Sequence, residues 1–220
     1  MWGQMKNIMV LGMGRSGTHA IIQWIANGIG GKVVQENNCF NGWEDKKLLP
    51  NSTKTTGRGD LCGTIKSIDD FYLPLWEEGG LCCFMTFDKV MVVVRSPRNW
   101  LASSIAAGGW ARDYLTKAPK NEPELPVSRV EAYCMCFADF YTKKRVYYDK
   151  WLSDGEYRKK VADQLGIKDT GIPKHCKFSS FGKNHNYNSD RYELLNKEQK
   201  KLFDSVYSGK LKAIQENWFE

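Results

Sequence analysis

The sequence has no apolar run approaching the roughly 18 residues of a membrane-spanning helix, so no membrane span is predicted. No signal peptide is predicted either, because the first apolar run, Ile8 to Leu11, is short and leads directly into a glycine-rich stretch. The seven cysteines are odd in number and follow no secretion signal, which predicts reduced thiols. We therefore expect a cytoplasmic protein with no membrane partner.

The chain also lacks internal repeats and low-complexity tracts, and it contains only three histidines. With 220 residues, of which 42% are hydrophobic, residues 1–220 are predicted to form a single domain with a sizeable core. The net charge of +7 suits an anionic ligand, but it suits a nucleic acid or a membrane surface as well. Net charge alone therefore does not identify the partner.

A metal site can be drawn from four side chains of metal-binding types, Cys134, Cys136, His175 and Cys176. However, Cys134 and Cys136 lie in an apolar helical pattern, which favours buried core thiols over metal ligands. No metal site is predicted from this cluster.

The stretch from Asn7 to Ile25 has the pattern of a strand, a turn and a helix. Apolar residues Ile8 to Leu11 predict a buried strand, Gly12 to His19 form a polar, glycine-rich loop, and a helix is predicted from Gly17 or Thr18. A helix start presents unpaired N–H groups and the positive end of its dipole to the loop. This stretch therefore predicts a site for phosphate or sulfate.

The rest of the chain alternates between strand and helix patterns, which predicts an α/β fold. We expect three layers, with a central, mostly parallel sheet and helices on both faces, and with ligands at the carboxyl ends of the strands. Strands are predicted at 31–36, 61–68, 89–94 and 145–151, and helices at 99–107, 130–143, 154–165 and 192–220, with a break near 208–209. Loops are expected at 37–60, 108–127 and 176–190, and a loop or a short helix at 69–80.

The first loop matches two nucleotide-binding patterns incompletely. Gly12-x-Gly14-x-x-Gly17 is the dinucleotide fingerprint, and Glu36 lies near the distance expected for a ribose-binding acid. Gly12 and Gly17 also have the spacing of a P-loop, but Thr18 replaces its lysine and His19 its magnesium-binding hydroxyl. Arg15, a strong cation at the centre of the loop, is required by neither pattern.

A second cluster follows the strongest predicted strand. Arg95 comes at the strand end and Ser103 about two helical turns later, so both side chains can donate to one phosphate. Together the clusters resemble the sulfotransferases that use 3′-phosphoadenosine 5′-phosphosulfate (PAPS). Their 5′-phosphosulfate loop is similar to Arg15-Ser16-Gly17-Thr18, and their 3′-phosphate motif is similar to Arg95-x-Pro97-Arg98 followed by Ser103. The order of the motifs, each after a strand, is that of the family.

The resemblance extends to the second half of the chain and implies a P-loop-like sulfotransferase fold. Tyr148 to Trp151, followed by a helix ending Leu165-Gly166, is similar to a late strand and helix of the family. The stretch Ser179 to Lys183 lies where the family has a loop that closes over the nucleotide. The implied donor-binding residues are Gly14, Arg15, Ser16, Gly17, Thr18, His19, Arg95, Ser103, Phe181, Gly182 and Lys183.

The resemblance also implies a reaction, the transfer of a sulfo group from PAPS to an acceptor hydroxyl or amine, with release of 3′,5′-ADP (PAP). Arg15 would stabilise charge on the leaving phosphate, so no metal is required. Lys66 would contact the sulfo group. Arg98 serves either the nucleotide or a loop salt bridge.

The identity of the general base differs between branches of the family. The small-molecule branch of the family uses a histidine that is absent from Lys66-Ser67-Ile68. The branches that act on protein tyrosine or polysaccharide use a glutamate after the second strand, and Glu36 has that place. Asp69 or Asp70 is the alternative base.

The acceptor itself is not predicted, although aromatic residues Phe40, Trp43, Trp110 and Tyr114 lie in the loops that would line its pocket. Two other functions compete with sulfo transfer. One is a P-loop-type nucleotide kinase or NTPase, and the other is a non-catalytic binder of a phosphorylated ligand or of nucleic acid. The two motifs together favour the sulfotransferase, so a nucleic-acid partner is not expected.

Overall fold

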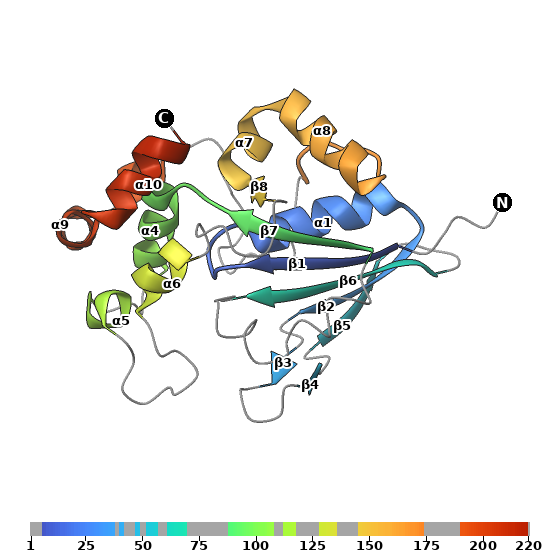
Figure 1. The fold of residues 1–220 in the computed structure, drawn as a ribbon, viewed down its shortest axis with the longest axis horizontal. Helices are drawn as coiled ribbons and strands as arrows, with labels where there is room; N and C mark the ends of the chain where they lie inside the picture. The colour runs from blue at the N-terminus through green and yellow to red at the C-terminus, as the bar shows by residue number, and fades with distance from the viewer. Residues whose placement is uncertain are drawn as a thin grey trace.

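A computed structural model describes residues 6–37, 40–41, 47–48, 52–56, 61–69, 88–107, 112–117, 128–135, 145–173 and 190–219 (Figure 1). The strands are β1 Lys6–Gly12, β2 Lys32–Asn37, β3 Phe40–Asn41, β4 Lys47–Leu48, β5 Ser52–Thr56, β6 Leu61–Asp69, β7 Lys89–Val94 and β8 Arg145–Tyr147. The helices are α1 Thr18–Ile29, α4 Pro97–Ala106, α5 Arg112–Thr116, α6 Arg129–Met135, α7 Tyr148–Ser153, α8 Gly155–Leu165, α9 Lys197–Val206 and α10 Lys210–Trp218, with a short 3-10 helix, η2, at Arg191–Leu194. No helix in these ranges is both long and apolar enough to cross a membrane.

The strands form a mostly parallel sheet with the order β5-β2-β6-β1-β7-β8. β1 lies between β6 and β7 and pairs in parallel with both, while β5 runs antiparallel to β2 at one edge. Gly12, the last residue of β1, is in register with Asp69 of β6 and with Val93 of β7. The first predicted loop therefore leaves from the middle of the sheet, at the carboxyl end of its strands.

Side chains of β1 alternate between two hydrophobic cores, one on each face of the sheet. Ile8 and Val10 pack with α1, α7 and α8, whereas Met9 and Leu11 pack with α4, α9 and α10. Figure 1 shows the second group of helices gathered at the carboxyl ends of β1, β6 and β7. The predicted three-layer α/β arrangement is confirmed, and it explains why β7 is almost entirely apolar.

Three sequence predictions need correction. The strand predicted over 145–151 ends at Tyr147, and α7 begins at Tyr148 with Asp149 in its first turn, where an acidic side chain favours a helix start. The stretch 37–60 contains the edge strand β5, which is polar throughout and so has no apolar pattern. The stretch 108–127 contains α5, which buries Leu115 in the core.

Other predictions are confirmed where the structure describes them. α8 ends at Gly166, which adopts the left-handed conformation, and the break between α9 and α10 falls at Gly209. The predicted helix over 130–143 is described as far as Met135. Most of the stretches 69–80 and 176–190 lies outside the described residues.

A half-buried polar network connects α1 to α8. Asp169 Oδ1 accepts hydrogen bonds from Trp24 Nε1 (2.9 Å), Arg158 Nε (3.1 Å) and the Gly171 N–H (2.9 Å). Desolvation alone would raise the pKa of Asp169, but these hydrogen bonds and the Arg158 charge outweigh it, and the net effect lowers the pKa. The charged carboxylate therefore stabilises the packing of α1 against α8.

We expect Asp169→Asn to destabilise the fold by about 1–3 kcal/mol at pH 7, since it weakens charge-assisted hydrogen bonds. Because the folded-state pKa lies below the ordinary value of 3.8, the contribution of Asp169 is complete above that pH and decreases as the pH falls through the folded-state pKa. Thermal unfolding of both chains between about pH 7 and pH 2.5 measures this. The difference should shrink with acidification.

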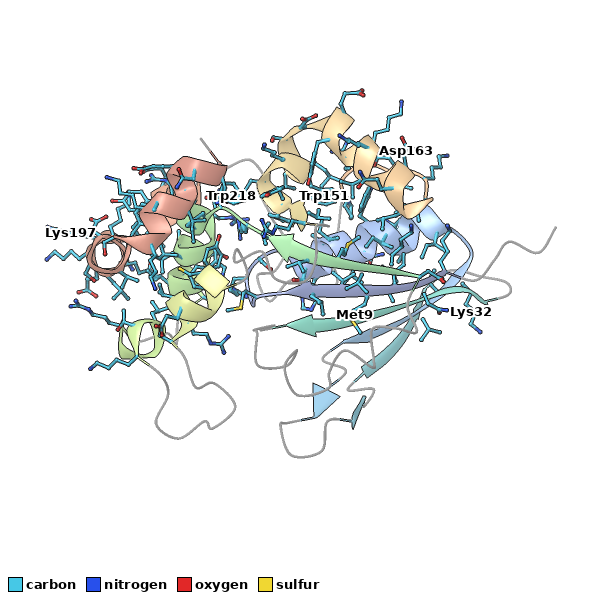
Figure 2. All side chains as sticks on the ribbon, viewed as in Figure 1. Met9, Lys32, Trp151, Asp163, Lys197 and Trp218 are labelled. Carbon is cyan, nitrogen blue, oxygen red and sulfur yellow. The ribbon has the colours of Figure 1, made fainter. Side chains whose placement is uncertain are left out.

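Asp163→Asn is the matched control, because Asp163 is exposed on α8, the helix that Asp169 follows in the chain (Figure 2). It should leave the free energy of unfolding within about 0.5 kcal/mol of the wild-type value. A difference between wild type and Asp169→Asn that stays constant with pH would contradict the role of the charge.

Candidate anion-binding site

The loop after β1 forms a tight turn that leads directly into α1. The Ser16 N–H donates to the Met13 carbonyl (3.0 Å), and α1 begins at Thr18, immediately after Gly17. Arg15 has a φ of 75°, which few residues other than glycine adopt. The loop thus places the arginine at its tip, directly before the amino end of a buried helix, as the sequence predicts.

The hydroxyl groups of Ser16 and Thr18 form a chain inside the loop. Ser16 Oγ donates to the Met13 carbonyl (2.6 Å) and lies 3.2 Å from Thr18 Oγ1. Because the single Ser16 hydroxyl hydrogen is used on Met13, Thr18 must be the donor in the second contact. Both the N–H and the hydroxyl of Ser16 thus stabilise the turn. A bound anion would have to redirect the Thr18 hydroxyl.

Two side chains of the second motif hold the first loop from one side. Arg95 Nη1 donates to the Arg15 carbonyl (3.0 Å), and Trp100 Nε1 donates to the Gly14 carbonyl (3.1 Å). In a trans peptide the N–H points away from the carbonyl. The N–H of Arg15 therefore points away from Trp100. The two motifs, 80 residues apart, form one structural unit.

Arg95 is buried among aromatic rings. Its carbonyl accepts a hydrogen bond from the Tyr133 hydroxyl, and its guanidinium lies 5.2 Å from the centre of the Tyr148 ring. Tyr133 also stacks on Trp100, with ring centres 4.2 Å apart. Arg95 Nε has no hydrogen-bond partner among the described residues. A buried cation with an unused donor is expected where an anion binds.

Asp149 connects the arginine to the start of α4. Its Oδ2 accepts from the Ser96 N–H (2.6 Å), and its Oδ1 accepts from Asn99 Nδ2 (3.0 Å). Arg95 Nε lies 3.9 Å from Oδ1, which is an ion pair and not a hydrogen bond. Sequence analysis missed this role, because Asp149 was assigned to a strand.

Positive charge is concentrated at this point. Burial is the main cause that lowers the pKa of Arg95, and of Arg15 as well, and the charge of Arg191 lowers both values further. Asp149 opposes the shift of Arg95. Sequence analysis also missed Arg191, since it follows a polar stretch without a motif. All three guanidinium groups remain cations at neutral pH.

Arg98 has the salt-bridge role and faces η2. Its Nη2 lies 2.9 Å from Asp190 Oδ2, and its guanidinium lies 4.5 Å from the centre of the Tyr192 ring. The hydrogen bond to Asp190 raises the pKa of Arg98. Of the two roles considered for Arg98, these contacts favour the loop salt bridge.

Ser103 and His19 lie in the elements that the sequence predicts. Ser103 is half-buried in α4, about two turns after Arg95, and His19 is half-buried in the first turn of α1. Their contact with a phosphate group stays a prediction. Phe181, Gly182, Lys183 and Asp70 lie outside the described residues.

The candidate base, Glu36, and the candidate lysine, Lys66, are aligned across adjacent strands of the sheet. Glu36 of β2 is in register with Lys66 of β6, which is in register with Met9 of β1. This line lies three residues before Gly12, or about 10 Å along the strand. Asp69 is instead level with Gly12. The sequence predicts Glu36 at the strand end, and β2 does end one residue later, but β1 and β6 extend further.

The described residues contain no group of three or more His, Cys, Asp or Glu side chains placed to bind a metal ion. Cys134 of α6 is half-buried against the core, and desolvation raises its pKa to about 11. It is therefore a protonated thiol at neutral pH, which agrees with the predicted core role. The other three residues considered as metal ligands lie outside the described ranges.

Comparisons with known proteins agree with this architecture. No family model and no curated protein matches the chain. Among solved structures, mouse sulfotransferase SULT7A1 complexed with PAP matches with a TM-score of 0.58 at 13% identity, covering 96% of this chain and 88% of that one. A sulfotransferase from Alicyclobacillus acidocaldarius matches with a TM-score of 0.48 at 13% identity, covering 92% and 94%. The chain has the P-loop-like α/β fold of the sulfotransferases.

Gly17 is required by both its conformation and its surroundings. Its φ of 92° is left-handed, and a Cβ at this position would overlap the ring of Tyr148. Gly166 also has a left-handed conformation, but there a Cβ would meet only the flexible end of Lys6. Substitutions at the two glycines can therefore be compared. Gly166 reports the free-energy cost of a side chain on a left-handed backbone, and Gly17 adds the cost of steric overlap.

We expect Gly166→Ala to lose about 1 kcal/mol of stability through its backbone conformation alone. Gly17→Ala should lose at least about 2 kcal/mol, because Tyr148 must also move. Chemical denaturation measures both values. Equal losses would show that the Tyr148 contact does not restrict the loop.

Proposed function

We propose that this protein is a sulfotransferase that moves a sulfo group from PAPS to an acceptor hydroxyl or amine. The proposal rests on one observation. A hydrogen bond from Arg95 Nη1 to the Arg15 carbonyl joins the two arginine-containing motifs. PAPS carries a phosphosulfate and a separate 3′-phosphate, and it needs two anion sites at a fixed distance. The structurally similar mouse sulfotransferase SULT7A1, whose structure contains PAP, supports the same donor.

The reaction forms one sulfur–oxygen (or sulfur–nitrogen) bond and breaks another. The acceptor atom attacks the sulfur in line with the bond to the phosphate oxygen, and the leaving group is 3′,5′-ADP. Arg15, with N–H groups at the start of α1, stabilises the negative charge that develops on the leaving phosphate. Arg15 and these N–H groups would perform the role that a lysine and a magnesium ion have in P-loop kinases.

The acceptor must lose a proton as it attacks, and Glu36 is our candidate to receive it. Glu36 and Lys66 are neighbours in register, so a base and a cation for the sulfo group come from adjacent strands, β2 and β6. Asp69, level with Gly12, is the alternative. The acceptor class is a hydroxyl or an amine, and no described residue narrows it further.

Nucleotide titration tests the donor. Wild-type protein should bind 3′,5′-ADP at least about 10-fold more tightly than 5′-AMP, because one additional charge-assisted contact to a phosphate group raises affinity by about that factor. Ser103→Ala should reduce that preference, and Arg95→Ala should abolish it. Isothermal titration calorimetry with 3′,5′-ADP, 5′-AMP, ATP and NAD measures these affinities.

The same titration separates the competing functions. Tighter binding of ATP that requires magnesium would indicate a kinase or NTPase, and preference for NAD would indicate an oxidoreductase. Because Arg95 is buried and its loss endangers folding, Ser103→Ala provides the independent variant. An undiminished preference for 3′,5′-ADP in Ser103→Ala would remove Ser103 from the 3′-phosphate site.

Glu36→Gln tests the base. The substitution should leave the affinity for 3′,5′-ADP within about 2-fold and lower turnover by about 100-fold or more, as expected for loss of a general base. A screen of hydroxyl and amine acceptors with sulfur-labelled PAPS supplies the assay. Glu156→Gln, an exposed carboxylate in the first turn of α8, is the control and should retain full turnover. Unchanged turnover in Glu36→Gln would transfer the role to Asp69 or Asp70.

A further inference from the structure

Three hydrogen bonds connect the start of α4 with α7 and with η2. The Ser96 N–H donates to Asp149 Oδ2 (2.6 Å), and Asn99 Nδ2 donates to Asp149 Oδ1 (3.0 Å). Asn99 Oδ1 in turn accepts from the Arg191 N–H (3.0 Å), and this contact anchors η2. We call these three contacts the Asp149 relay. The relay begins at the residue that follows Arg95 in the chain.

The relay fixes the backbone that carries the Arg95 side chain. The peptide group between Arg95 and Ser96 is held on both sides, because its carbonyl accepts from the Tyr133 hydroxyl and its N–H donates to Asp149. Ser96 is also the N-cap of α4, where its side chain accepts from the Asn99 N–H (3.4 Å). A peptide group is planar, so these contacts set the direction in which the side chain of Arg95 leaves the main chain.

Only some combinations of side chains satisfy the relay. The backbone N–H groups of Ser96 and Arg191, at its two ends, can only donate. Between them, one carboxylate and one carboxamide satisfy all three contacts, as Asp149 and Asn99 do. Two carboxamides would leave two donors facing each other, and two carboxylates would leave two acceptors facing each other.

We propose that Asp149 is a positioning residue for the 3′-phosphate of the donor and that it acts through Arg95. This inference rests on the proposed function. Arg95 Nε lies 3.9 Å from Asp149 Oδ1, which is too far for a hydrogen bond, and it has no hydrogen-bond partner among the described residues. Asp149 therefore holds the backbone of Arg95 and leaves Nε for the phosphate. As an anion itself, Asp149 does not bind the phosphate directly.

Asp149→Asn separates the relay from a simple effect of charge. Removal of a carboxylate near Arg95 makes the site more positive, which on electrostatic grounds alone strengthens the binding of an anion. The relay predicts the opposite, because the new carboxamide places one N–H donor against another. In calorimetry, the preference for 3′,5′-ADP over 5′-AMP should fall from at least about 10-fold to about 2-fold or less.

An exchange of the two side chains should rescue this loss. Asn99→Asp alone should also lower the preference, because it places two carboxylates against each other. The double variant Asp149→Asn, Asn99→Asp again has one carboxylate and one carboxamide, and its composition and net charge equal those of the wild type. Its preference for 3′,5′-ADP should return to within about 3-fold of the wild-type value.

Asp154→Asn is the matched control for net charge. Asp154 is exposed and is the N-cap of α8, directly after α7, and asparagine is an equally good N-cap. The substitution changes the net charge by the same unit as Asp149→Asn. Both nucleotide affinities should stay within about 2-fold of the wild type. A fall in preference equal to that of Asp149→Asn would overturn the proposal.

The outcomes separate this inference from the function on which it rests. A wild-type protein that does not prefer 3′,5′-ADP over 5′-AMP contradicts the proposed function, and the inference with it. A wild-type preference that Asp149→Asn leaves unchanged or raises contradicts the inference alone. An equal loss for both nucleotides also contradicts it, because a general effect on the fold does not distinguish the ligands. If thermal unfolding shows that Asp149→Asn does not fold, the double variant decides: a folded double variant without the preference overturns the proposal.

Discussion

A single buried guanidinium determines how the site is built. Arg95 donates to the carbonyl of Arg15, so the side chain of one motif fixes the backbone of the other. Trp100 reinforces the contact from the next helical turn. These two hydrogen bonds occupy the carbonyl groups of Arg15 and Gly14 on the side of the loop that faces α4. Under the proposed function, the residue that binds one phosphate group of the donor therefore also maintains the shape of the loop that binds the other.

Such a site must balance attraction for an anion against repulsion among its own cations. Asp149 partly neutralises Arg95, and it also caps backbone and side-chain donors of α4. A second carboxylate beside Arg95 would stabilise the empty site and compete with the ligand. Under the proposed function, an anionic donor would relieve the repulsion that the charge of Arg191 exerts on Arg15 and Arg95.

Much of this arrangement follows from the sequence, because its signals are local. The apolar runs of β1 and β7 predict buried parallel strands, and Gly166 predicts the end of α8. Other features depend on tertiary contacts. The change from strand to helix at Tyr148 is accompanied by Asp149 bonding to a distant helix, and Arg191 follows a stretch without a motif. A polar edge strand such as β5 likewise has no periodic pattern to reveal it.

The sequence separation of these contacts has a consequence for folding. Arg95 and Arg15 lie 80 residues apart, Asn99 and Asp149 50 residues apart, and Asn99 and Arg191 92 residues apart. Closing such long segments lowers the conformational entropy of the chain before any contact compensates for that loss. The site is therefore expected to form late in folding. During synthesis the anchor of η2 cannot form until Arg191 has left the ribosome, 92 residues after Asn99. Formation of these contacts would then mark a late stage of folding, since no earlier intermediate holds Arg15, Arg95 and Arg191 together.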